Sequence, residues 1–332
     1  MGAMRQLLWG RTLSAVLLLT GACGTAVGAP SPPPPAPPPV TAAPAPSPAP
    51  TTVPQHAGTP AASRDADPVP APAPARQLRA ATVPDDPTVQ PVAAEGPRRL
   101  ARQILATERV IRNPRSTENQ LAVAGHTQQV AYRAWSQKPR YDAVALPALP
   151  RSLRPIARRN LTAHRELASL SGTKPPKTLP EWRIVRPAPR QELKRYYRKA
   201  QRIFGVRWQY LAAINLVETR MGRIRGVSTA GAQGPMQFIQ PTWDIYGRGD
   251  IRDPHDAIMA AARYLRARGA PGDMGRALYS YNNDVRYVRA VAAHAKAMMY
   301  EPRTYRAYYH WQVYYRQPGG AVWLPVGYDG RS

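Results

Sequence analysis

The chain has 332 residues and carries 46 Lys and Arg against 20 Asp and Glu, a formal net charge of +26. Such an excess of positive charge favours an anionic partner: nucleic acid, an anionic membrane surface or an anionic wall polymer. The basic residues are scattered along the sequence and no nucleic-acid-binding motif is present, so we expect no nucleic acid partner. The single cysteine excludes a disulfide within the chain.

The first 23 residues have the pattern of an export signal. Arg5 and Arg11 precede the apolar run LSAVLLLT, which is too short to span a membrane. The run ends in LTGAC, which resembles a lipobox, and this predicts a lipoprotein signal with Cys23 as the lipidated first residue of the mature protein. The alternative is an ordinary signal peptide that is cleaved near AVGA. Either one predicts an exported protein, anchored to the outer face of the cytoplasmic membrane or secreted into the cell wall.

Residues 24–96 are rich in proline and alanine. Twenty of the 39 prolines fall between Pro30 and Pro87. A segment of this composition has little to bury and favours extended polyproline II, so we expect a disordered linker.

Residues 97–188 read as a helical region of unknown function. Apolar residues at helical spacing and terminal signals predict helices over 97–113, 116–135 and 151–170. A proline-rich loop follows, from Lys174 to Pro189. We expect this region to dock onto the remainder of the chain.

Residues 189–328 read as a second helical region that ends in a hairpin. The tail WQVYYRQPGGAVWLPVGY has two runs rich in β-branched and aromatic residues around Pro-Gly-Gly, which is typical of a β-hairpin. Its aromatic residues are expected to pack on neighbouring helices. No other strand is predicted, so the fold class is all-α with a small β appendage. The helices are expected over 190–205, 206–222, a short segment opened by Pro241, 253–269, 273–284 and 285–299.

Glu218 interrupts the apolar face of its predicted helix. Ile214 and Leu211 lie four and seven residues earlier, on the same face. Burial penalises a charged carboxylate, so we expect the pKa of Glu218 to be raised and the group to be protonated near neutral pH. A neutral carboxylic acid can protonate a departing glycosidic oxygen. The alternative is a glutamate at the helix end that faces solvent or pairs with Arg220 or Arg223.

The loop STAGAQGPMQF follows this helix and contains no charge. Gly234 permits a tight turn, and Gln237 offers an uncharged donor and acceptor beside the apolar Met236 and Phe238. These groups suit a sugar better than a phosphate, for which a lysine in the glycine-rich loop is expected.

Four blocks in this order resemble the lytic transglycosylases of the goose-type-lysozyme and soluble-transglycosylase group: ETRMG, then STAGAQGPMQF with PTW, DPHDAIMAAARYL and SYNNDVRYV. The GPMQF form is most similar to the variant related to membrane-bound lytic transglycosylase B. The resemblance runs from Gln191 to Met299 and implies a lysozyme-like catalytic domain within residues 189–328.

The resemblance also implies roles for particular residues. Glu218 is then the catalytic acid, Gln237 contacts the sugar near the scissile bond, and Tyr281 and Asn282 line the groove, with the tyrosine near the catalytic carboxylate. Thr219 stands where the family usually has serine. The implied substrate-binding residues are Thr219, Gly234, Met236, Gln237, Phe238, Tyr281 and Asn282.

Other acidic residues make weaker candidates for the site. Asp253 and Asp256 read as helix-start residues. Asp250 and Asp253 supply too few oxygens for calcium, so we expect no metal, and no cofactor is expected either. No second carboxylate has a strong claim to the chemistry.

A single carboxylate fits the lytic transglycosylase reaction. The implied activity is cleavage of the MurNAc–GlcNAc β-1,4 bond of peptidoglycan glycan strands, which leaves a 1,6-anhydro-MurNAc end. Two alternatives stay open: a muramidase that hydrolyses the same bond, and a non-catalytic wall-binding module. We expect a monomer whose partners are glycan strands and an anionic wall polymer or membrane surface.

Overall fold

The computed structural model describes residues 86–172 and 174–330. The predicted signal peptide with Cys23, and the linker up to residue 85, lie outside the described residues. Among the described residues, no helix has the length and apolarity needed to cross a bilayer.

The N-terminal helical region has the three predicted helices, and a fourth helical segment that was not predicted. Helix α2 begins two residues later than expected, because the side chain of Thr117 caps it in a reciprocal capping box with Gln120. The elements are α1 (Pro97–Arg112), α2 (Glu118–Ser136), a 3-10 turn (Pro139–Tyr141), α3 (Asp142–Ala148) and α4 (Arg154–Leu170).

The remainder of the described chain is also helical, and the predicted hairpin is present. Strands β3 (Val313–Gln317) and β4 (Gly320–Leu324) pair antiparallel, with Gln317 opposite Gly320 at the turn. The mostly helical fold with a C-terminal hairpin is therefore confirmed. The helices are α5 (Arg190–Phe204), α6 (Trp208–Thr219), α7 (Gln240–Tyr246), α8 (Pro254–Ala267), α9 (Met274–Tyr281), α10 (Val285–Tyr300) and α11 (Thr304–Tyr309), the last of which was not predicted.

The prediction that no other strand exists is wrong. Strand β1 (Arg183–Ile184) lies in the expected loop and pairs antiparallel with β2 (Ile224–Arg225). Two-residue strands are too short to show the alternation by which a strand is recognised in sequence. The pairing places the loop before α5 beside the segment that follows α6.

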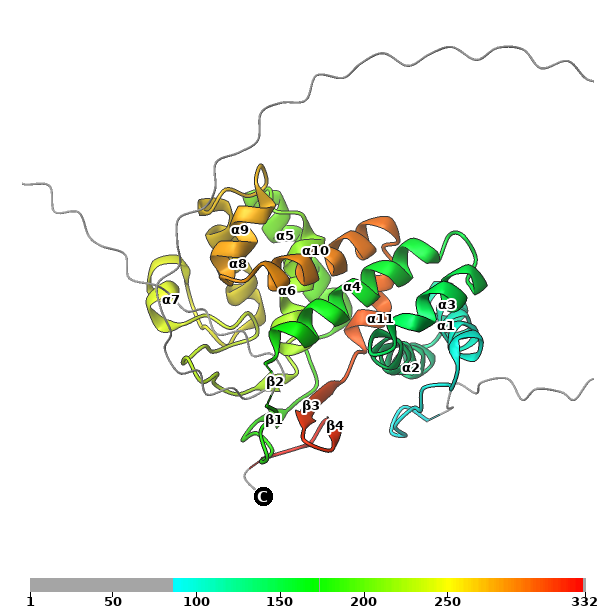
Figure 1. The fold of residues 1–332 in the computed structure, drawn as a ribbon. Helices are drawn as coiled ribbons and strands as arrows, with labels where there is room; N and C mark the ends of the chain where they lie inside the picture. The colour runs from blue at the N-terminus through cyan, green and yellow to red at the C-terminus, as the bar shows by residue number, and fades with distance from the viewer. Residues whose placement is uncertain (1–85, 173, 331–332) are drawn as a thin grey trace, which may run out of the picture. The chain divides into compact units, whose positions relative to one another are not determined.

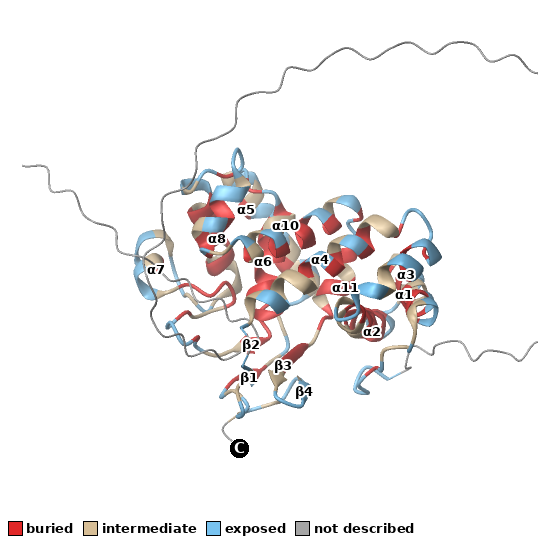
Figure 2. Cartoon of the chain, in the orientation of Figure 1, coloured by how far each residue is buried: buried red, intermediate tan, exposed pale blue. Residues whose placement is uncertain are grey.

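Helix α6 lies at the centre of the described helices. Figure 2 shows it as buried along most of its length, and α5 and α10 pack against it (Figure 1). Helix α4 runs along α10, so the N-terminal helices cover the side of α10 that α6 leaves open. One continuous hydrophobic core includes Trp135 of α2, Ile156 of α4 and Ile214 of α6. The N-terminal helical region thus shares its core with the helix that carries Glu218.

The C-terminal aromatic residues pack on the helices, as predicted. Trp311 is 1% exposed and contacts the rings of His164 and His294. The hydroxyl of Tyr308 donates to Asn160 Oδ1 on α4 at 2.7 Å. These contacts tie the tail to both helical regions.

Candidate active site

Glu218 occupies the last turn of α6 and is 2% exposed. The helix ends there because Arg220 and Met221 have positive φ angles of 53° and 64°. Arg220 donates to the carbonyl of Leu216 and Arg223 to those of Tyr309 and Trp311. The alternative of a solvent-facing or arginine-paired glutamate is therefore wrong.

The environment of Glu218 favours its neutral form. Burial raises its pKa to about 8, and a hydrogen bond from Tyr287 acts in the opposite direction. The Tyr287 hydroxyl donates to Glu218 Oε1 at 2.7 Å. The carboxyl group is therefore protonated near neutral pH, as its place on the apolar face predicted.

Tyr287 is the partner of Glu218 that the sequence reasoning missed. The resemblance implied that Tyr281 lies near the carboxylate, and the ring of Tyr281 does stack on that of Tyr287, with centroids 6.4 Å apart and planes 5° apart. The hydrogen bond to Glu218, however, comes from Tyr287. In the sequence, Tyr287 is the second tyrosine of the block SYNNDVRYV, and this position could have indicated it.

The loop after α6 closes on itself by a short backbone pairing. Gln233 and Phe238 form an antiparallel bridge, and the amide of Gln237 donates to the carbonyl of Gly234. Gly234 has a φ of +72°, and a Cβ at this position would lie 1.9 Å from the carbonyl oxygen of Ile251. Only glycine fits there, so the predicted tight turn is present, and the backbone of Ile251 approaches it closely.

Gln237 has a strained backbone and a side chain with an unpartnered acceptor. Its φ is +50°, a conformation that costs free energy for any residue with a Cβ. The side chain is largely buried, and Nε2 donates to the Gly234 carbonyl at 3.0 Å. Its Oε1 is buried and has no partner among the described residues. A buried acceptor without a partner is costly, so this oxygen is an unsatisfied polar atom within the loop.

Two hydroxyl groups hold this loop in position. Thr219 donates to the carbonyl of Pro235 at 2.6 Å, and Tyr281 donates to the carbonyl of Met236 at 2.6 Å. Thr219 and Met236 are fully buried and Phe238 is 4% exposed. In this conformation the three side chains act as internal packing that supports the loop, and they present almost no surface to a ligand.

Asn282 and Tyr287 lie on either side of the junction between α9 and α10. Asn282 follows the last residue of α9, and the side chain of Asp284 caps α10 by accepting from the amide of Arg286. This cap starts the helix that delivers Tyr287 to Glu218. Asn282 is 6% exposed.

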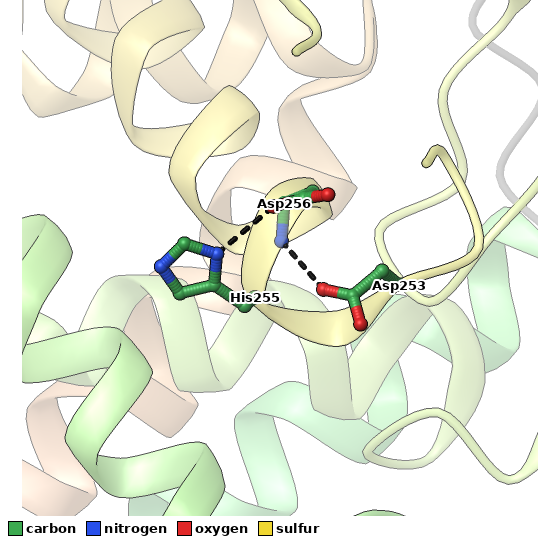
Figure 3. Close-up of side chains that lie close together, drawn as sticks. All are labelled: Asp253, His255 and Asp256. Carbon is green, nitrogen blue, oxygen red and sulfur yellow. Dashed lines mark hydrogen bonds and ion pairs between the residues drawn. The ribbon is translucent and has the colours of Figure 1, made fainter. Parts of the chain in front are cut away.

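Asp253, His255 and Asp256 at the start of α8 bring their ligand atoms within 4.8 Å of one another, close enough to hold a metal (Figure 3). Asp253 accepts from the Asp256 amide and so caps α8, as the sequence predicted. Lys199 Nζ donates to His255 Nε2, so the proton of this ring is on Nδ1, which donates to Asp256 at 2.9 Å. Through these contacts the three side chains cap the start of α8 and pack it against Lys199 of α5.

Comparison with known proteins identifies the part of the chain that holds these residues. Residues 195–301 match the transglycosylase SLT domain model. An 80-residue segment is 32% identical to membrane-bound lytic murein transglycosylase F of Thiobacillus denitrificans (strain ATCC 25259 / T1), and it covers 24% of this chain and 17% of that protein. No solved structure matches the chain. The chain therefore contains an SLT transglycosylase domain, which spans α5 to α10 and includes Glu218, Gln237 and Tyr287.

Proposed function

We propose that this protein is a lytic transglycosylase that cleaves the MurNAc–GlcNAc β-1,4 bond of peptidoglycan and leaves a 1,6-anhydro-MurNAc end. The observation that carries the proposal is the buried, neutral Glu218 with its hydrogen bond from Tyr287, inside an SLT domain. A general acid needs this protonation state at the pH at which the reaction runs.

In this proposal Glu218 acts twice. Its proton passes to the O4 leaving oxygen as the bond from C1 to O4 breaks. The carboxylate then accepts the proton of the C6 hydroxyl, whose oxygen attacks C1 and closes the anhydro ring. The acid is restored and no water is consumed. The N-acetyl group of the muramyl residue assists at C1.

Tyr287 stabilises the carboxylate between these two steps. A hydrogen bond to the charged form lowers the free energy of that form, and here the donor is fixed by burial in α10. The burial that keeps Glu218 neutral before the reaction would otherwise make the intermediate carboxylate too costly. Tyr287 is thus proposed to tune the same group for both roles.

Gln237 is proposed to contact the sugar beside the scissile bond through its unpartnered Oε1. Asn282 is proposed to line the groove with it. Gly234, Thr219 and Tyr281 support this contact indirectly, because they fix the position of the loop. The buried side chains of Met236 and Phe238 exclude water from the inner side of this loop. The closer kinship to the B-type variant, which rests on GPMQF, remains a prediction.

We further propose that the protein acts outside the cytoplasmic membrane. The relative is named as membrane-bound, and the sequence LTGAC predicts a lipid anchor at Cys23. Peptidoglycan glycan strands are the proposed substrate, and the monomer is the proposed form. The net charge of +26 suits an anionic wall polymer or membrane surface as a further partner.

Clearing of purified sacculi by the wild type and by Glu218→Gln tests this function. The substitution keeps the size of the side chain and an acceptor for Tyr287 but removes the transferable proton. We expect loss of clearing with retained binding. Glu181→Gln, an exposed change, is the matched control and should clear like the wild type. Clearing by Glu218→Gln at the rate of an active wild type would show that Glu218 is not the acid. Absence of clearing by both proteins would favour the wall-binding alternative.

A further inference from the structure

Three arginines are linked by strand pairing and hydrogen bonds from the β1–β2 pair to the loop that carries Gln237. We call Arg183, Arg225 and Arg252 the arginine strip. Arg183 and Arg225 are directly opposite each other in the antiparallel pairing. Arg225 Nη1 donates to the carbonyl of Arg252 at 3.1 Å, and Arg252 Nη2 donates to Gln233 Oε1 at 3.1 Å. Gln233 in turn pairs with Phe238, the neighbour of Gln237.

The charges of the strip are poorly compensated. Like charges directly opposite each other across two strands are destabilising. The side chain of Arg183 is 63% exposed, and its contact with Asp329 is long, at 3.9 Å. Such an exposed pair contributes little. Asp250 accepts from the backbone amide of Arg252, at the end of the strip that adjoins the loop. The arrangement therefore keeps positive charge next to the candidate site at some cost to stability.

An open surface pocket adjoins the Arg183 end. It has a volume of about 390 Å³, and it combines the two basic residues Arg183 and Arg186 with one acidic residue, Asp329, and with the apolar Val185 and Val326. A pocket lined by apolar side chains and by more guanidinium groups than carboxylates fits a short peptide that carries carboxylates.

We propose that the arginine strip binds the carboxylates of the peptide stems that are attached to the glycan strand in the active site. The inference rests on the proposed function, because the stems are part of the peptidoglycan substrate. The planar guanidinium groups match carboxylates with two parallel hydrogen bonds. The strip begins at Arg252, which bonds Gln233 in the loop that also bears Gln237, so it adjoins the loop proposed to contact the sugar.

Two substrates separate stem recognition from glycan cleavage. One is sacculus that was treated with acid to remove phosphate polymers but retains its peptides, and the other is the same glycan after an amidase has removed the peptides. The test variant is Arg225→Gln/Arg252→Gln. The control is Arg198→Gln/Arg202→Gln, which removes two exposed positive charges from α5. Melting temperatures verify that each variant is folded.

On peptide-bearing glycan, we expect KM of the test variant to rise about five- to tenfold with kcat nearly unchanged, the scale of one or two lost solvent-exposed ion pairs. On stripped glycan, the variant should match the wild type, and the α5 control should match it on both substrates. Arg225→Lys/Arg252→Lys should recover part of the affinity.

Equal losses on both substrates, or none on either, would overturn the proposal. A loss that appears only on sacculi that still carry phosphate polymer would overturn it in favour of a phosphate partner. Co-sedimentation with both glycans gives a readout that needs no turnover. If the wild type cleaves neither glycan but still binds through the strip, the proposed function fails and the stem site stands. If it cleaves both without dependence on the strip, the reverse holds.

Discussion

Glu218 reduces the stability of the folded chain at neutral pH, because its pKa is raised to about 8 by burial. In the unfolded chain the group ionises near its ordinary pKa, whereas in the folded chain it stays protonated. The folded state therefore binds more protons between these two values. The free energy of unfolding is therefore highest below the unfolded pKa and falls as the pH rises from that value through the folded pKa.

The first prediction follows from this difference. Glu218→Gln should be as stable as the wild type near pH 4 and more stable by on the order of a few kcal/mol near pH 8, since glutamine cannot ionise. Thermal unfolding of both proteins across this range is the measurement. Parallel stability profiles would mean that Glu218 ionises freely in the folded protein.

The second prediction concerns the hydrogen bond from Tyr287. Tyr287→Phe removes the donor that stabilises the carboxylate, so the pKa of Glu218 should rise further. We expect a lower maximal rate, because the carboxylate that forms during the reaction loses a partner, and an alkaline limb of the kcat profile at higher pH. The pH dependence of turnover on glycan strands measures both effects.

A matched variant separates this effect from the loss of any buried hydroxyl. Tyr308→Phe removes the bond to Asn160 in the shared core, away from Glu218. It should lower stability and leave the alkaline limb where it is. If the two variants shift the limb equally, Tyr287 has only a structural role.

At the scale of elements, the loop between α6 and α7 depends on one glycine. In Gly234→Ala the new Cβ would lie 1.9 Å from the Ile251 carbonyl oxygen, at a φ of +72° that alanine disfavours. The loop must move, and with it Gln237. We expect a loss of turnover of about 100-fold, the scale of an ångström-sized displacement in an active site.

Gly231→Ala is the matched control for this third prediction. Gly231 has a similar φ of +77°, but nothing lies within 4 Å of the position of its Cβ. The substitution should cost about 1 kcal/mol of stability from backbone strain and little activity. Comparable activity in the two variants would show that the position of the loop does not matter to turnover.

The helices were predictable because their signals are local. Asp253 and Pro254 mark the start of α8, Gly205 ends α5 with a left-handed backbone, and Pro-Gly-Gly marks the hairpin turn. The β1–β2 pair was not predictable, because its two residues per strand gain their structure from a partner some forty residues away. Short α3 and α11 likewise depend on tertiary packing.

The site was predictable in part, because some of its signals are also local. The apolar face around Glu218 predicted that the residue is buried and that its pKa is raised, and both predictions are confirmed. The same reasoning could not tell whether a hydrophobic residue lines a groove or fills the core, so Met236 and Phe238 were placed at the ligand. Which of two tyrosines reaches the carboxylate depends on the angle between α9 and α10, which no local pattern encodes.

At the scale of the whole molecule, several histidines are buried where the helical regions and the C-terminal tail pack together. His126, His294 and His310 are buried, and burial lowers their pKa values to about 3, 3 and 4. Arg220 and Arg223 lie near them and disfavour a further positive charge. These histidines connect the N-terminal helices, α10 and the C-terminal tail, so their protonation opposes the packing of all three.

The fourth prediction is a loss of stability in acid. The unfolded chain protonates its histidines as the pH falls through about 6.5, whereas the folded chain resists until about 3 to 4. The unfolded state binds more protons in this window, so stability is lost as the pH falls. Thermal unfolding in the Glu218→Gln background, where the opposing effect of Glu218 is absent, should show the decline between pH 6.5 and 4.

His294→Phe offers a comparison within this background. The ring of His294 lies against Tyr308 and Trp311, and phenylalanine keeps those aromatic contacts. The variant should lose less stability on acidification than its parent. An unchanged slope would mean that His294 does not contribute to the decline.

The central claim is that one buried acid, without a second carboxylate, carries out an intramolecular transfer. Mass spectrometry of the products from sacculi digested by the wild-type protein tests it most directly. The account predicts muramyl ends lighter by one water than reducing ends, in the 1,6-anhydro form, and no such products from Glu218→Gln. Reducing muramyl ends alone from the wild type would contradict it and identify the protein as a hydrolase.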